Sequence, residues 1–112
     1  MATQQAEITA AALSERYRET REQSLALISE LQPEDTVVQS MPDVSPTKWH
    51  LAHVTWFFER FVLEPGLKGY SRFDDQYHFL FNSYYYTAGQ MHARPKRGLL
   101  SRPTLNQVLD YR

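Results

Sequence analysis

The segment SPTKWHLAHVTWFFE, residues 45–59, constrains the fold of this chain more than any other stretch. At about 100° per residue, Trp49 and Trp56 fall on the same side of a helix as His53. A helix surface this apolar has to be buried. The segment therefore predicts an imidazole inside an aromatic face, where each ring nitrogen needs a partner and a metal ion is one candidate.

Capping residues, prolines and apolar periodicity predict where the two long helices begin and end. Ser45 is expected to be the N-cap of this helix, with Pro46 at the first helical position, where no N–H is needed. We expect the helix to end before Pro65. An earlier helix is predicted over residues 9–31, because its apolar residues recur at three- and four-residue steps. Residues 1–8 are expected to be disordered.

The remaining segments predict short elements. Residues 32–46 contain three prolines and are expected to form an irregular connector that packs on the domain. Residues 74–88 suit either a strand or a helix. One or two helical turns, capped by Asp74 and ended by Gly89, are favoured because no other convincing strand exists to pair with this segment. Residues 90–103 are basic and irregular, and Thr104 is expected to cap a final helix.

Composition excludes several classes of protein. The 112 residues include 12 Lys plus Arg and 13 Asp plus Glu, and this balance argues against a nucleic-acid or membrane-surface binder. The absence of cysteine excludes disulfides, zinc–thiolate sites and a cysteine nucleophile. No apolar run approaches the roughly 20 residues of a membrane span, and the N-terminus lacks the features of a signal peptide. A cytoplasmic location is therefore expected.

Three segments, taken in order, resemble the sulfoxide synthases of ergothioneine biosynthesis (hercynine oxygenases of the EgtB type). They are SPTKWHLAHVTWFFE at 45–59, LFNSYY at 80–85 and HARPKRGLLSRPT at 92–104. The similarity covers roughly residues 10–112, which is essentially the whole chain. Each segment alone would be moderately specific, and the three together in this order make the resemblance strong.

The resemblance implies an all-α fold and an iron-dependent oxidoreductase. Such enzymes have an N-terminal DinB-like four-helix bundle and a C-terminal lectin-like domain, with iron(II) held by three histidines between them. They use oxygen to join the sulfur of γ-glutamylcysteine or cysteine to hercynine as a sulfoxide. Residues 9–112 are then expected to be a partial DinB-like bundle, a fragment without the lectin-like domain.

The same resemblance assigns roles to individual residues. His53 matches the first metal ligand, whereas the other two histidines belong to a later helix that this sequence does not include. Three protein ligands are usual for this chemistry, so the chain is expected to be inactive alone. An arginine of the basic loop, Arg94 or Arg97, is expected to bind the carboxylate of the thiol substrate, and spacing does not decide between them.

Other interpretations stay open for these residues. His53 also suits a core histidine bonded to a carbonyl, and His50 is interpreted as structural. Glu59 falls on a distant side of the helix from His53 and is expected to face solvent or an ion-pair partner. Residues 84–86, three tyrosines, are interpreted as packing.

Two other functions are compatible with the sequence. One is a non-catalytic interaction module that self-associates through the exposed face of a half-bundle. The other is a different DinB-type protein, a metal-dependent thiol transferase.

Overall fold

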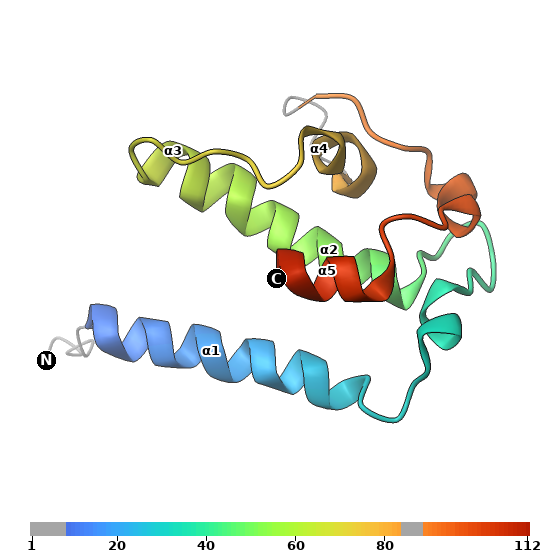
Figure 1. Cartoon of the computed structure of the whole chain (residues 1–112), viewed down its shortest axis with the longest axis horizontal. Coiled ribbons are helices and arrows are strands. Elements are labelled where there is room, and N and C mark those ends of the chain that lie inside the picture. The colour runs from blue at the N-terminus through green and yellow to red at the C-terminus, as the bar shows by residue number, and fades with distance from the viewer. Residues whose placement is uncertain (1–8, 84–88) are drawn as a thin grey trace, which may run out of the picture. The chain divides into compact units, whose positions relative to one another are not determined.

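The structure, a computed structural model, describes residues 9–83 and 89–112. The expected disorder of residues 1–8 and the expected packing of residues 84–86 lie outside these ranges. Within them the chain is helical and has no strand, which confirms the all-α prediction (Figure 1). The chain divides into two units, residues 1–30 and residues 31–112.

The first unit contains helix α1 (Ala10–Leu27). The Thr9 side chain caps its start by accepting a hydrogen bond of 3.0 Å from the Ala12 N–H. The helix ends at Leu27, earlier than predicted. Ser29 donates both its N–H and its hydroxyl to the carbonyl of Ala26, three residues earlier. Such bonds form a turn narrower than that of an α-helix, and they end the helix before Pro33.

The second unit is built around one long helical rod. Helix α2 (Thr47–Phe58) continues through a π-helical segment, Glu59–Leu63, into α3 (Glu64–Gly66). The prediction that this helix ends before Pro65 is wrong. The wider π-helical turn changes the hydrogen-bond register, so a residue without an N–H is tolerated in the first turn of α3.

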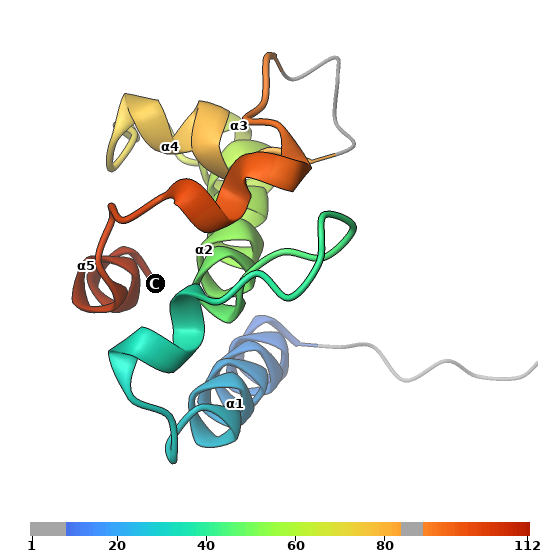
Figure 2. The same ribbon diagram turned by 90° about the vertical axis from the view of Figure 1, so that its right-hand side faces the viewer.

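Two short helices lie against α2, as the two views show (Figures 1 and 2). They are α4 (Asp75–Phe81) and α5 (Leu105–Tyr111). Asp74 and Thr104 cap them as predicted, since each side chain accepts a hydrogen bond from a backbone N–H of the first turn. The connectors are also partly ordered into 3-10 helices, Pro33–Val37 and Arg94–Leu99.

Two predicted boundaries around α2 and α4 are wrong. Pro46, not Ser45, occupies the N-cap position of α2 and makes no side-chain cap. The Ser45 hydroxyl instead accepts a hydrogen bond of 2.9 Å from Arg97 Nη1. Helix α4 has the predicted length of one or two turns, but it ends at Phe81 rather than at Gly89. Side chains of α2 bind the free carbonyl groups of its last turn.

The core of the second unit is aromatic. One face of α2 provides about half of it, and α4 and α5 provide the rest. The buried apolar residues are Trp49, Leu51, Ala52, Trp56, Tyr77, Phe81, Val108 and Tyr111. The face of α2 that carries His53 is thereby fixed against α4.

Candidate functional site

His53 lies between two tryptophan rings of its own helix. Its imidazole is 4.6 Å from Trp49, centroid to centroid, with planes 12° apart. On Trp56 the corresponding values are 5.6 Å and 23°. The three side chains form what we call the aromatic stack, and its existence confirms that they share one side of α2. Stacking restricts the rotation of the imidazole, so its ring nitrogens have fixed directions.

A hydrogen bond determines which ring nitrogen of His53 carries the proton. Nδ1 lies 2.6 Å from the carbonyl oxygen of Phe81. Because a carbonyl oxygen only accepts, Nδ1 must carry the hydrogen of this bond. In the neutral ring the lone pair is then on Nε2. This arrangement, with Nδ1–H on a backbone carbonyl, is the one that orients metal-binding histidines in proteins.

The aromatic stack also holds the end of α4. The Trp49 indole donates a 2.8 Å hydrogen bond to the carbonyl of Leu80, next to the carbonyl that His53 uses. The Trp56 indole donates to His78 Nδ1 at 3.2 Å. Each residue of the stack therefore binds one group of the same helix. The sequence did not predict this arrangement, although two buried indole N–H groups require acceptors.

The surroundings of His53 favour its neutral form. Burial lowers the pKa of the imidazole most, and the nearby His50 and Arg97 lower it further. The Phe81 carbonyl acts in the opposite direction without reversing the shift. His53 is therefore a neutral donor at neutral pH, which is the form that binds metals.

We expect acid to destabilise the fold partly through His53. Its pKa is lower in the folded than in the unfolded chain, so the unfolded chain binds the proton more tightly. The free energy of unfolding should therefore fall as pH drops below about 6.5 and stop falling below the folded pKa. Urea unfolding at several pH values should show a smaller fall for His53→Gln than for the wild type. Identical pH dependence would contradict this assignment.

Arg97 is a buried structural cation. It is only 2% exposed, and its guanidinium lies 3.9 Å above the Trp49 ring. It donates to the Ser45 hydroxyl at 2.9 Å and to the Asn82 carbonyl at 3.3 Å. Arg97 therefore joins the segments before α2 and after α4 to the second 3-10 helix.

Arg94 and Arg97 line one cleft in the second unit. Its volume is about 380 Å³. The lining residues are Pro42, Asp43, Ser83, Met91, Arg94, Pro95 and Arg97. The structure thus brings the two sequence-predicted arginines together, and Arg94 is the less buried of them. His53 is not a lining residue of this cleft.

The number of possible ligands decides whether these residues could hold a metal ion. His53 fits as one ligand, because Nε2 keeps its lone pair. Residues 9–83 and 89–112 contain no group of three or more His, Cys, Asp or Glu side chains that could hold a metal ion. His50 is exposed and meets the Trp49 ring edge-on. The described residues therefore supply one candidate ligand and not a complete site.

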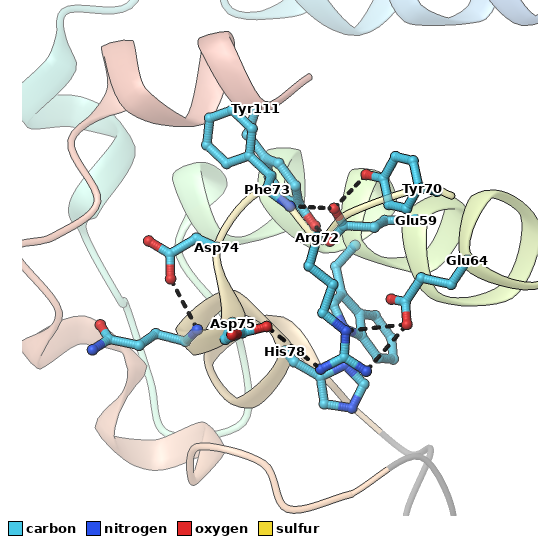
Figure 3. Close-up of polar contacts among 11 residues, drawn as sticks. Glu59, Glu64, Tyr70, Arg72, Phe73, Asp74, Asp75, His78 and Tyr111 are labelled. Carbon is cyan, nitrogen blue, oxygen red and sulfur yellow. Dashed lines mark hydrogen bonds and ion pairs between the residues drawn. The ribbon is translucent and has the colours of Figure 1, made fainter. Parts of the chain in front are cut away.

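The predicted surroundings of Glu59, solvent or an ion-pair partner, are wrong. Glu59 is 3% exposed and does not face solvent, nor does it form an ion pair within the described chain. Figure 3 shows its carboxylate accepting three hydrogen bonds, from the Tyr70 hydroxyl at 2.5 Å, the Phe73 N–H at 3.0 Å and the Tyr111 hydroxyl at 2.7 Å. Glu59 thus fastens the loop before α4 and the end of α5 to the central rod.

Comparison with known families agrees with this architecture. The model of the DinB superfamily matches residues 16–112. The chain belongs to the DinB superfamily. No curated protein matches this DinB chain in a sequence search. Among its described helices, none combines the length and apolar character needed to cross a membrane. Superfamily membership is compatible with a metal-dependent protein and leaves the reaction to be proposed.

Proposed function

We propose that this DinB chain supplies His53 as one ligand of a non-haem iron(II) centre. The enzyme is an oxygen-dependent sulfoxide synthase that joins a cysteine-type thiol to hercynine. The observation that carries the proposal is the geometry of His53, with Nδ1–H on the Phe81 carbonyl and the ring between Trp49 and Trp56. The three sequence segments that resemble the sulfoxide synthases support the choice of reaction.

Each residue has a limited part in this proposal. Iron(II), when bound, supplies the binding and activation of oxygen. The stacked rings hold the imidazole in one orientation and keep water from its faces. An arginine of the cleft binds the carboxylate of the thiol substrate, γ-glutamylcysteine or cysteine. Two further metal donors must come from outside the described residues, so this chain alone is expected to be inactive.

Metal binding tests the role of His53 directly. The 112-residue chain is titrated anaerobically with iron(II), and the histidine ring nitrogens are followed by NMR. We expect the Nε2 signal of His53 to shift or broaden first, with binding weaker than at a complete three-ligand site. His53→Ala should abolish this effect.

His50→Ala is the matched control, because His50 lies one turn earlier on α2 and is exposed. It should leave the response of His53 unchanged. A response that survives His53→Ala, or that disappears with His50→Ala, would overturn the ligand assignment.

Exposed apolar residues support a second candidate, a non-catalytic interaction module. Four apolar residues of the central rod and of the loop after it are 38% to 54% exposed, namely Val54, Phe61, Val62 and Leu67. Such surface favours self-association or a protein partner. Sedimentation in metal-free buffer distinguishes this candidate, since it requires assembly without metal. A DinB-type thiol transferase with another divalent metal is distinguished by metal selectivity.

A further inference from the structure

A small cavity lies between the start of α2 and the segment that precedes α5. Its volume is about 10 Å³, which is room for one water molecule or one ion of similar size. Three cationic side chains line it, Lys48, Arg97 and Arg102, whereas no Asp or Glu does. We call it the cationic cavity. Such a lining is unusual, because buried cations in proteins are normally paired with an anion.

Lys48 is buried in this lining without a carboxylate partner. It is 4% exposed, and its Nζ donates to the carbonyls of Leu100 at 3.3 Å and Ser101 at 3.4 Å. Both distances exceed the usual range of N–H···O bonds, which is about 2.7–3.2 Å. The ammonium has three N–H donors, so these two long contacts leave one for a further acceptor. Within residues 9–83 and 89–112, Lys48 forms no ion pair.

The two arginines increase the positive charge around the cavity. Arg97 is 2% exposed, whereas Arg102 is exposed and likewise forms no ion pair in the described part of the chain. Burial lowers the pKa of Lys48 most, and the charge of Arg102 lowers it further. The cations therefore repel one another. A negative charge in the cavity would offset this repulsion and give Lys48 its missing acceptor.

We infer that the cationic cavity binds one small monovalent anion of halide size, such as chloride. A monatomic anion accepts hydrogen bonds from any direction and is only slightly larger than water, so the cavity has room for it. Sulfate, phosphate and organic carboxylates each have several heavy atoms and are too large. The bound ion joins Lys48 at the start of α2 to the residues around Arg102. This site is separate from the proposed iron centre.

Chloride NMR tests for the site directly. The ³⁵Cl line broadens when the ion exchanges with an ordered site on a protein. The 112-residue chain is titrated with sodium chloride, and sodium gluconate keeps the ionic strength constant because gluconate is too large to enter the cavity. We expect saturable broadening that bromide reverses and sulfate reverses much less effectively. Equal reversal by bromide and sulfate would overturn the proposal, since the ion would then lie on an open surface.

Two variants test the lining. Lys48→Met keeps the length of the side chain and removes its charge, so chloride should bind about tenfold more weakly or worse. Arg102→Gln changes an exposed cation, whose contribution is screened, and should weaken binding about two- to fivefold. Lys68→Met and Arg16→Gln are matched controls, because both residues are exposed and neither lines the cavity.

Circular dichroism first shows whether each variant folds. If Lys48→Met does not fold, Arg102→Gln and the comparison of bromide with sulfate decide the question. The proposal is overturned if the wild type shows no saturable broadening or if the folded variants bind chloride as the wild type does. Equal weakening by the two control variants would also overturn it, because general surface charge would then explain the binding. None of these results depends on His53, which the iron titration tests separately.

Discussion

Glu59→Ala is expected to lower the free energy of unfolding by on the order of 3 kcal/mol or more. The substitution removes the acceptor of three hydrogen bonds, of which the one from Tyr111 is buried and those from Tyr70 and Phe73 are partly buried. A buried donor left without a partner costs about 1–3 kcal/mol. It also leaves a cavity where the π-helical segment, α5 and the loop before α4 meet. Urea unfolding followed by tryptophan fluorescence measures the loss.

Two substitutions serve as comparisons for Glu59→Ala. Glu59→Gln keeps the shape and one oxygen acceptor, so it should cost less than half as much. Glu64→Gln affects the more exposed carboxylate that pairs with Arg72 at 3.1 Å in Figure 3, and such pairs contribute about 1 kcal/mol or less. Equal losses for Glu59→Ala and Glu64→Gln would show that the carboxylate of Glu59 does not fasten the fold.

The two tyrosines are suited to be permanent donors to Glu59. Burial, and then the hydrogen bond to Glu59, raise the pKa of Tyr70 to about 12. The same two causes raise the pKa of Tyr111. Both hydroxyls therefore keep their protons throughout the physiological range. The two neutral hydroxyls satisfy the carboxylate of Glu59 without a cation. For this reason the expectation of an ion-pair partner for Glu59 was wrong.

Local signals predicted the parts of the fold that depend on neighbouring residues. Asp74 and Thr104 bond to N–H groups two or three residues away, so cap preferences alone identify them. The shared side of His53 and the tryptophans follows from the helical period alone. These features need no knowledge of tertiary structure.

Distant contacts account for the wrong predictions. Ser45 does not cap α2 because Arg97, 52 residues later, takes its hydroxyl. Glu59 is buried because its partners lie 11 and 52 residues along the chain, at Tyr70 and Tyr111. A single sequence does not specify such pairings, since a serine before a helix and a glutamate after aromatic residues have other common uses.

The candidate site, like the fold, could be predicted only where it depends on local sequence. The motif identified His53, but the hydrogen bond that sets its tautomer comes from a backbone carbonyl, which has no sequence signature. The basic loop suggested both Arg94 and Arg97, and spacing did not decide between them, although Arg94 was preferred. Both arginines line the cleft. Only the packing of Arg97 on the Trp49 ring shows that Arg97 has a structural role.

Trp56→Ala is expected to destabilise the fold by about 3–5 kcal/mol, as is typical when a large aromatic core residue is truncated. Trp56 is 1% exposed and contacts both His53 and His78. Thermal or urea unfolding followed by circular dichroism measures the loss without relying on tryptophan emission. Val54→Ala, at a 41% exposed position two residues earlier on the same helix, should cost much less.

Trp56→Phe separates the structural role of Trp56 from its effect on the site. Phenylalanine keeps an aromatic ring on α2 but removes the indole N–H that binds His78 Nδ1. The expected loss of stability is about 1–3 kcal/mol, from one unmade hydrogen bond and a smaller ring. The His53 imidazole should keep its proton on Nδ1, because the Phe81 carbonyl and the Trp49 ring still hold it. A change of the His53 tautomer in NMR would mean that the stack, and not the carbonyl, sets which nitrogen can bind a metal.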